Sequence, residues 1–398
     1  SAGGVLVLEG GTFTMEEGRI ADNKGHRGAG VLLFGGVVND EEKMAQFTMN
    51  GGSISGNETT GYLTLSDGTS LNPGGAGVYV LNDAEFTLND GSIANNINKQ
   101  GMGGGVATEA YYPEKRGGVF VMNGGTVGGN LAQCGGGIYS YSNDVYLLAG
   151  TIAQNEATSL GGGAYVSVQG RSIHLGDGTV IMGNYATVMG GGVWSCPTGT
   201  VVLAEDKTAV FDNTAEGAGD DVAALRKTTG IETSINTCTL GGGVAIWYND
   251  GATFTNVLNN SELGSVDENA ARYMEGDASV QAPQGSTDSF TGKALLTDGA
   301  KEASIASAKL LITANTAARG GGLGSNGSIL QESGDIQPDE IEVNKVWAED
   351  SIPLDSVTIY LVMTRGDEWT LVAQTELSED NDWHDTFLYI PQEGAEYT

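Results

Sequence analysis

The sequence has few of the residues on which cross-links and most metal sites depend. Only 3 of its 398 residues are cysteine, 3 are histidine and 7 are proline. Cys134, Cys196 and Cys238 are too few for a disulfide framework and lack metal-ligand spacing, so we expect plain buried side chains. No run of about 18 apolar residues is present, so we expect no transmembrane helix.

Basic residues are also scarce. The chain has 18 lysines and arginines against 50 acidic residues, which gives a formal net charge of -32. Such a charge repels phosphate backbones and anionic lipids, so we expect neither a nucleic-acid partner nor membrane insertion. The first residues, SAGG, lack the charged and apolar regions of a signal peptide and fall inside a repeat, so we expect an excised, monomeric segment of a longer protein.

Glycine is abundant, and it belongs to a repeat. The 64 glycines indicate many tight turns between short strands. The repeated words are FTMEEGRIADN at 13–23, FTMNGGSISGN at 47–57, FTLNDGSIANN at 86–96, FVMNGGTVGGN at 120–130, VYLLAGTIAQN at 145–155 and IHLGDGTVIMGN at 173–184. A unit this short cannot bury its apolar face alone, so the copies must stack on one another, which predicts a solenoid.

Each repeat predicts one coil of a β-helix. Alternating apolar positions predict a strand with one buried face, and Asn-Gly, Asp-Gly or Ala-Gly then predicts a turn. A second strand ends at an asparagine, and a third follows a run of glycines, as in GGGIYSY at 135–141 and GGGVAIW at 241–247. The corner asparagines should form a hydrogen-bonded ladder along the helix. They are Asn23, Asn57, Asn96, Asn130, Asn155, Asn184, Asn213 and Asn315.

Three parallel strands per coil predict an all-β fold, a right-handed parallel β-helix over residues 1–330. A β-propeller would need four antiparallel strands per repeat and a more constant period. The pattern fails around 255–305, where we expect an insertion packed outside the coils. Residues 331–340 have the composition of a polar linker.

The segment between the asparagine and the glycines carries a family resemblance. The words NLAQCGGG at 130–137, NEATSLGGG at 155–163, NYATVMGGG at 184–192 and NTAARGGG at 315–322 resemble the pectin-lyase-like β-helix segments of large surface proteins from Gram-positive bacteria. This resemblance implies the fold more than the function.

A second resemblance concerns the C-terminal residues. IEVNKVWAEDSIPLDSVTIYLVM at 341–363 and LSEDNDWHDTFLYIP at 377–391 resemble the Cna protein B-type domain, a β-sandwich stalk of cell-wall-anchored adhesins. The matching positions are Lys345, Trp347, Val357, Trp383, Phe387 and Tyr397. In the family this lysine forms an isopeptide bond with an asparagine of the last strand, assisted by an acid. Both partners would lie beyond Thr398, so we expect residues 341–398 to form an incomplete domain and Lys345 to remain a free amine.

Catalysis has one weak candidate in the sequence. Polysaccharide lyases on this fold need a calcium-binding carboxylate cluster and a base, and hydrolases need paired acids. Asp220 and Asp221, in FDNTAEGAGDDVAAL, are the nearest match, but Ala215 replaces the acid of the preceding word. We expect them to form a solvated acidic turn, with no metal or cofactor. His174 alternates with two inward residues, so we expect it on the surface.

One set of aromatic residues suggests a binding face. If Val78 and Val80 point inward, Tyr79 points outward, and the same phase places Tyr139, Tyr165 and Trp194 outside in other coils. Such an exposed column, interrupted at Ala107, would suit a sugar face or a protein partner. The alternative is that the rings stack on one another or lie beneath loops.

Together these features predict a non-catalytic, extracellular adhesin or ligand-binding segment of a bacterial cell-wall-anchored protein. Its ligand would be a host glycan, a mucin or a host protein such as immunoglobulin, among which the sequence does not choose. One alternative is a polysaccharide lyase or glycoside hydrolase on the same β-helix. The other is a structural spacer without a ligand.

Overall fold

The computed structural model describes most of the repeat region and part of the C-terminal region. The described residues are 2–38, 41–64, 70–71, 73–110, 117–196, 198–204, 206–224, 233–234, 238–251, 254–255, 265–266, 272, 292–296, 300–331, 339–346, 356–365, 368–378, 383–389 and 396–398.

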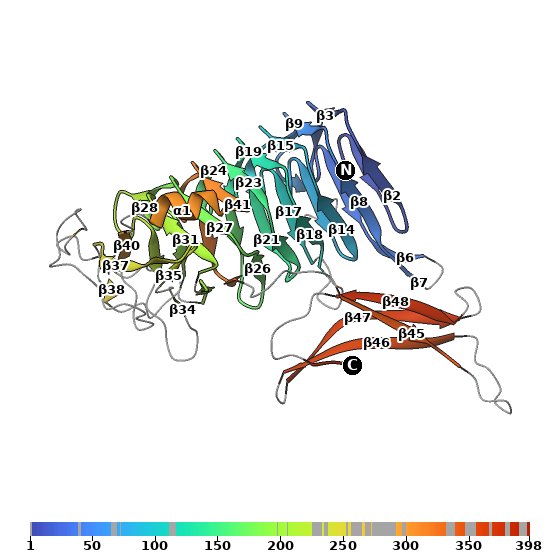
Figure 1. The fold of residues 1–398 in the computed structure, drawn as a ribbon. Helices are drawn as coiled ribbons and strands as arrows, with labels where there is room; N and C mark the ends of the chain where they lie inside the picture. The colour runs from blue at the N-terminus through green and yellow to red at the C-terminus, as the bar shows by residue number, and fades with distance from the viewer. Residues whose placement is uncertain are drawn as a thin grey trace.

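The repeat region is a parallel β-helix, as the sequence predicts, and four long sheets run along it (Figure 1). In spatial order, sheet B contains β2 (Thr12–Met15), β8 (Ala45–Met49), β14 (Ala84–Leu88), β18 (Val119–Met122), β22 (Val145–Leu147), β26 (Ser172–Leu175), β44 (Ser328–Gln331), β30 (Thr200–Val202) and β34 (Thr233–Ser234). Sheet C contains β3 (Arg19–Ala21), β9 (Ser53–Ser55), β15 (Ser92–Ala94), β19 (Thr126–Gly128), β23 (Gly150–Ala153), β41 (Leu310–Thr313), β27 (Thr179–Met182) and β31 (Thr208–Phe211).

The other two sheets follow the asparagine corner and the glycines. Sheet D contains β4 (Lys24–Gly25), β10 (Glu58–Thr59), β16 (Ile97–Met102), β20 (Leu131–Cys134), β24 (Glu156–Leu160), β42 (Thr316–Arg319), β28 (Tyr185–Met189) and β32 (Thr214–Ala215). Sheet A contains β1 (Val5–Val7), β5 (Val31–Phe34), β13 (Val78–Leu81), β17 (Val106–Glu109), β21 (Ile138–Tyr141), β25 (Ala164–Val166), β43 (Leu323–Ser325), β29 (Val193–Ser195) and β33 (Val222–Ala224), followed by β40 (Gly292–Leu296) and β37 (Ile246–Asn249).

The prediction of three strands per coil is therefore wrong, because sheet D is a fourth. Its strands are short and lie in the few residues between the asparagine and the glycines. In this stretch an inward alanine, such as Ala132 or Ala186, alternates with outward residues. So brief an alternation is a weak signal in a sequence.

The core is a set of columns that run along the helix axis. Phe13, Phe47, Phe86 and Phe120 stack with ring centroids 4.9, 4.9 and 5.3 Å apart, close to the spacing of adjacent strands. Beside them the apolar residues of the repeat pack in one continuous cluster that excludes water. The predicted inward positions of the repeat are confirmed.

The corner asparagines form the predicted ladder. In each step the backbone N–H and the side-chain Nδ2 of one asparagine donate to Oδ1 of the next, as from Asn96 to Asn130, both at 2.9 Å. Nδ2 also donates to a backbone carbonyl, here that of Ile54. Asn57, Asn96, Asn155 and Asn315 are fully or almost fully buried. The ladder gives their polar groups hydrogen-bond partners, without which burial would cost folding free energy.

One coil occupies a place along the helix that differs from its place along the chain. The inserted coil, residues 310–331, lies between the coil of 150–175 and the coil of 179–202 in all four sheets. β41 thus pairs with both β23 and β27 (Figure 1). The ladder passes from Asn155 to Asn315 and only then to Asn184. The predicted corner residue Asn315 and the repeat word at 315–322 are confirmed as parts of a coil, and the structure adds the position of that coil.

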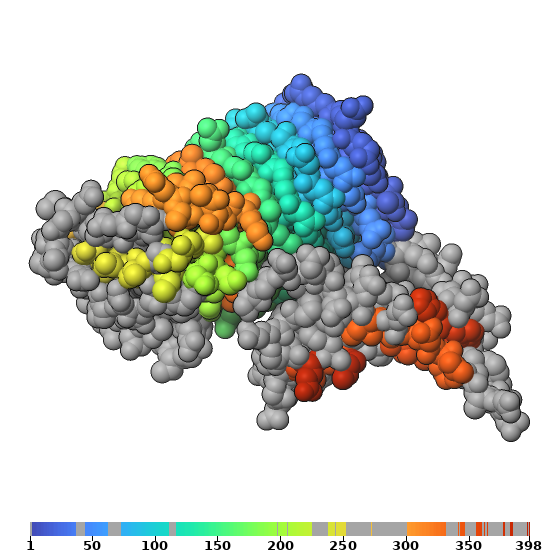
Figure 2. All heavy atoms as spheres, viewed as in Figure 1, coloured from blue at the N-terminus to red at the C-terminus, as the bar shows by residue number. Residues whose placement is uncertain are grey.

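The described residues between the coil that ends at Ser234 and the inserted coil do not continue the four-sheet pattern. They include β35 (Cys238–Thr239), β36 (Gly243–Val244), β37, β38 (Phe254–Thr255), β39 (Ser265–Val266), β40 and α1 (Ala300–Ala306). β33, β40 and β37 pair antiparallel, so the prediction that 241–247 forms a parallel coil strand is wrong. Most of the predicted insertion at 255–305 lies outside the described residues. In Figure 2 the orange segment that carries α1 lies against the green middle of the chain.

Four short antiparallel pairs and the C-terminal strands complete the described residues. β6 (Gly36–Val38) pairs with β7 (Glu41–Lys43), β11 (Leu63–Thr64) with β12 (Ser70–Leu71), β35 with β36, and β38 with β39. In the C-terminal region β45 (Asp339–Asn344) pairs antiparallel with β48 (His384–Tyr389). β46 (Ser356–Arg365) pairs antiparallel with β47 (Glu368–Ser378) and β49 (Glu396–Tyr397). This region is thus all-β and antiparallel.

Candidate functional site

The two candidate catalytic acids replace two glycines of the repeat. Gly191 and Gly192 donate their N–H groups to the carbonyls of Gly219 and Asp220, and Val193 donates to Asp221. Asp220 and Asp221 therefore stand where the preceding coil has its second and third glycines. A side chain on Gly192 would meet Asn213 Nδ2 at 2.8 Å and the Asp221 carbonyl at 2.5 Å. Glycine at the third position thus makes room for the coil that stacks next.

Asp221 ends the asparagine ladder. Its Oδ1 accepts hydrogen bonds from the backbone N–H of Asn213 at 3.1 Å and from Asn213 Nδ2 at 2.9 Å. In the preceding step Asn184 makes the same two bonds to Asn213 Oδ1, at 3.0 and 2.9 Å. The Asp221 carboxylate, which is 3% exposed, thus replaces the amide oxygen that a further coil would supply. The expectation that this acid lies in a solvated turn is wrong.

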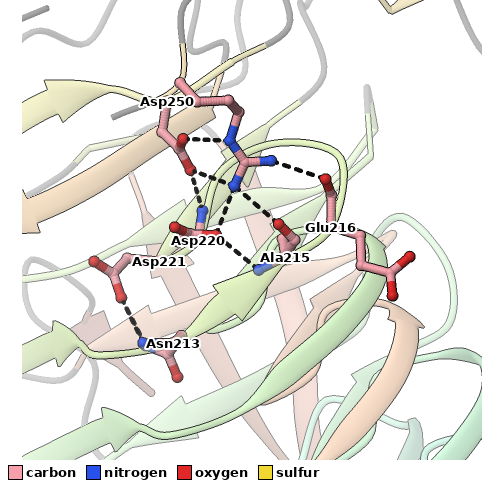
Figure 3. Close-up of polar contacts among 7 residues, drawn as sticks. Asn213, Ala215, Glu216, Asp220, Asp221 and Asp250 are labelled. Carbon is pink, nitrogen blue, oxygen red and sulfur yellow. Dashed lines mark hydrogen bonds and ion pairs between the residues drawn. The ribbon is translucent and has the colours of Figure 1, made fainter. Parts of the chain in front are cut away.

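Asp220 and Arg272 complete the end of sheet D (Figure 3). Asp220 Oδ1 accepts from the Ala215 N–H at 2.8 Å, and Arg272 Nη2 donates to the Ala215 carbonyl at 2.9 Å. In the preceding coil the carbonyl of Ala186 accepts instead from the N–H of Glu216. Side chains therefore supply the donor and the acceptor that another strand would bring to this edge.

Asp250 holds the arginine in position. Arg272 Nε donates to Asp250 Oδ1 at 2.7 Å, and Asp220 donates its backbone N–H to Asp250 Oδ2 at 2.7 Å. Burial raises the pKa of Asp220, and the neighbouring Asp250 adds to this, while Ala215 N–H and Arg272 oppose it. We call Asp220, Asp221, Asp250 and Arg272 the end cap. Sequence reasoning found only the first two, and Arg272 lies in a stretch without a repeat pattern.

The end cap engages its acids in hydrogen bonds within the protein. Within the part of the chain that the structure describes, no three histidine, cysteine, aspartate or glutamate side chains gather as metal ligands.

His174 does not lie on the surface as predicted, because it is 3% exposed. Its ring stacks on Tyr146, and its Nε2 lies 2.9 Å from Ser172 Oγ and 3.1 Å from the Asn143 carbonyl.

The aromatic column points away from the core as predicted, but the prediction that it is exposed is wrong. Tyr79 is 2% exposed and Tyr165 and Trp194 are each 4% exposed, while Tyr139 is half-buried. Residues just before the glycines pack with Tyr139, Tyr165 and Trp194 in a second apolar cluster: Met102, Cys134, Leu160 and Met189. Tyr79 packs instead in a third cluster with Leu32, Phe34 and Ala107 of the adjacent strands. The inserted coil also interrupts the column, because Gly324 pairs between Tyr165 and Trp194.

Burial has consequences for the tyrosine hydroxyls and the cysteines. It raises the pKa of Tyr139 to about 12, and it raises that of Tyr165 as well. The Tyr79 hydroxyl bonds to the Glu109 carboxylate, whose own pKa is raised by burial.

Cys134 and Cys196 are buried as predicted, whereas Cys238 is exposed. No disulfide links these three.

A hollow of about 380 Å³ lies on the outer side of sheet D near its first strands. Its lining consists of Lys24, Glu58, Thr59, Thr60, Gly61, Lys99 and Gln100. Lys24 Nζ lies 2.9 Å from Glu58 Oε2, and this hydrogen bond lowers the pKa of Glu58. Lys99 is exposed, and its charge also contributes to the lowered pKa of Glu58. Behind the hollow, buried His26 Nδ1 lies 2.6 Å from the Gly61 carbonyl.

The C-terminal candidate, Lys345, follows β45. Its backbone N–H donates to the Trp383 carbonyl at 2.8 Å, and its Nζ donates to the Val346 carbonyl at 3.1 Å. Trp347, another residue of the resemblance, lies outside the described residues. Val357 and Phe387 lie in β46 and β48, and Tyr397 lies in β49. The strands thus place Lys345 at the end of a paired strand.

Comparison with known proteins finds no match, so a function has to be inferred from the fold and from the residues. No protein family matches the chain, no curated protein resembles it, and no solved structure matches it. A membrane-spanning helix of sufficient length and hydropathy is not found among the described residues.

Proposed function

We propose that this chain is a non-catalytic, extracellular ligand-binding segment of an adhesin on the surface of a Gram-positive bacterium, and that its ligand is an acidic host glycan. The observation that carries the proposal is the hollow on sheet D, whose described lining has two lysines and one glutamate. A locally positive hollow on a chain with a net charge of -32 favours a small anionic group over a large anionic surface.

The lining suits a sugar acid in particular. Lys99 offers an ammonium group to a carboxylate or sulfate, and Thr60 and Gln100 offer hydrogen bonds to hydroxyl groups. Tyr62, adjacent to the lining residue Gly61, is 57% exposed and provides an aromatic surface at the protein exterior. Polar groups at defined positions in a binding site fix the orientation of the bound ligand.

The end cap argues against the alternative of a hydrolase or lyase at Asp220 and Asp221. Asp221 is 3% exposed and accepts two hydrogen bonds from Asn213, so it has no access to a polysaccharide. Asp220 is bound to Arg272 and to the Ala215 N–H. Both acids therefore serve the fold.

The location at the cell wall rests on the resemblance of residues 341–398 to a Cna B-type stalk domain. The antiparallel pairing of β45 with β48 and of β46 with β47 and β49 is compatible with a sandwich. We expect no isopeptide bond between Lys345 and another residue of 1–398. An intact mass equal to that of the unmodified sequence would agree with this, and a deficit of one ammonia that disappears in Lys345→Ala would contradict it.

The binding proposal is tested with a glycan array that carries sialylated, uronic-acid and sulfated glycans beside their neutral counterparts. We expect the chain to bind acidic glycans, to bind them less at high salt, and to lose at least about tenfold in affinity in Lys99→Ala, since a hydrogen bond to a charged group is lost.

Arg19→Ala is the matched control. Arg19 is an exposed cation in the first coil, paired with Asp22 outside the hollow, so its loss should leave binding unchanged. Equal binding of neutral glycans would contradict the proposal, as would capture of immunoglobulin or mucin protein without any dependence on Lys99.

A further inference from the structure

We propose that Asp221, supported by Asp220, is a stop signal that prevents residues 310–331 from stacking in chain order and directs them into the gap between the coils of 150–175 and 179–202. One sequence would then choose between two stacking orders, whichever ligand the chain binds.

The inserted coil has every feature of a coil that could stack at the end of the helix. It carries the corner residue Asn315, the inward Ala317 and the glycines Gly320, Gly321 and Gly322. Following the chain, its natural place would be on the coil of 208–234. Either place gives the same number of interfaces between coils, so the repeat itself does not select one.

The turn between β26 and β27 does not require a coil to be inserted beside it. β26 is the sixth strand of sheet B and β27 is the seventh of sheet C, because β41 precedes it, so the chain moves one coil spacing further between Leu175 and Thr179. It does so with three residues, 176–178. The turns 50–52, 89–91 and 123–125 also have three residues, and they join strands of the same rank in the two sheets. If the inserted coil left, β23 could pair with β27 directly.

The registers on both sides of the gap also agree. Ile152 pairs with Ile312, and Ile312 pairs with Ile181, while Glu156 and Tyr185 both pair with Thr316. The two flanking coils could therefore close on one another without a shift in register. A second stacking order is thus available to the backbone.

The end of the helix is where the two orders differ. The third glycine of each coil lies against the asparagine of the next coil, as Gly163 does with Asn315 and Gly322 with Asn184. The second position accepts alanine in two coils, at Ala29 and Ala76, but the third position is glycine in every coil except the one that carries Asp221. There the carboxylate already occupies the acceptor position that Asn315 would fill. β40 also pairs with β33, so it would have to leave the edge of sheet A before a coil could stack there. Stacking at this end is therefore opposed at two places, and the gap remains.

The experiment reports which coil lies beside Thr316. Two cysteines on adjacent parallel strands lie about 4.8 Å apart and can form a disulfide, whereas two coil spacings, about 10 Å, are too far. In a background with Cys134, Cys196 and Cys238 replaced by serine, the pair Glu156→Cys with Thr316→Cys reports the inserted position. The pair Thr214→Cys with Thr316→Cys reports stacking at the end. Oxidised glutathione and peptide mass mapping give the yield of each cross-link.

With Asp220 and Asp221 present we expect the cross-link to position 156 alone. In Asp220→Gly Asp221→Gly the ratio of the 214 cross-link to the 156 cross-link should rise at least about tenfold, because the two bonds to Asn213 then become available to Asn315. Asp221→Asn keeps the acceptor and should retain the original order. Asp22→Gly, an exposed acid at a turn where other coils have glycine, is the control and should change nothing.

Retention of the 156 cross-link alone in the double glycine variant would overturn the proposal. Should that variant be unfolded by circular dichroism, Asp221→Gly alone decides, because it leaves the Asp220 and Arg272 contacts in place. A measurable 214 cross-link then supports the stop signal, and the 156 cross-link alone refutes it.

Discussion

Coils that stack in chain order and the coil that inserts out of order are held by the same contacts. Asn130 in the first group and Asn315 in the inserted coil each accept two hydrogen bonds from one asparagine and donate two to the next. Val127 and Ile312 are both fully buried in the core. What differs is how the chain reaches them. The contiguous coils follow from a local turn, whereas the inserted coil depends on contacts with residues far away in sequence.

This difference shows that a repeat specifies the interface between two coils but not the order in which the coils stack. Any two coils with the same corner, alanine and glycines can stack, because the interface is identical at each step. An order becomes unique only where a coil departs from the repeat. The departures here are at the end cap, where Asp220 and Asp221 replace two glycines.

The largest expected effect comes from breaking the ladder in each region. Asn130→Ala and Asn315→Ala should each cost about 3–5 kcal/mol of unfolding free energy, because each leaves at least two buried donors of the preceding asparagine without an acceptor. Urea denaturation measures the loss. Only Asn315→Ala should also expose residues 310–331 to limited proteolysis below the unfolding transition. Equal protease resistance of the two variants would show that the inserted coil is held as firmly as the others.

A smaller effect is expected from crowding the coil interfaces. A Cβ on Gly137 or Gly163 would lie 2.4 Å from the carbonyl of Gly163 or Gly322, respectively, so in both variants a neighbouring coil must shift. We expect Gly137→Ala and Gly163→Ala each to cost about 1–3 kcal/mol. Hydrogen exchange should locate the loss at coils stacked in chain order for Gly137→Ala and within 310–331 for Gly163→Ala. Loss of protection spread over the whole helix in both variants would contradict this distinction.

The smallest effect concerns pH. Burial lowers the pKa of His26 below its value of about 6.5 in unfolded chains, so the folded state binds fewer protons than the unfolded state below that pH. The stability of the first coil should therefore fall as the pH drops from about 6.5 toward the folded pKa. The inserted coil contains no histidine or acidic residue. Hydrogen exchange at pH 7 and pH 5.5 should show opening at residues 19–34 before 310–331, and His26→Gln should remove the difference. Persistence of the difference in that variant would assign it to another group.

Much of the coil could be predicted from the sequence because its signals are local. Phe47 and Met49 are buried because they alternate with polar residues, and the corner asparagines recur after the same strand. The burial of Tyr79 and Tyr165 could not be predicted, because it depends on neighbouring coils. Residues of adjacent sheet A strands pack on Tyr79, and residues just before the glycines pack on Tyr165. The role of Asp221 was equally hidden, because its place in the repeat follows from the hydrogen bonds with the preceding coil.

The sequence by itself determined the β-helix, its inward columns, the ladder and the repeat word at 315–322, since each rests on the spacing of nearby residues. Only the tertiary structure decided that the last coil lies between Asn155 and Asn184 and that Asp221 terminates the ladder. The physical reason is that identical interfaces leave stacking order undetermined. Order then depends on which edge is already satisfied by hydrogen bonds, and here the end cap satisfies one edge while the gap leaves two open to the inserted coil.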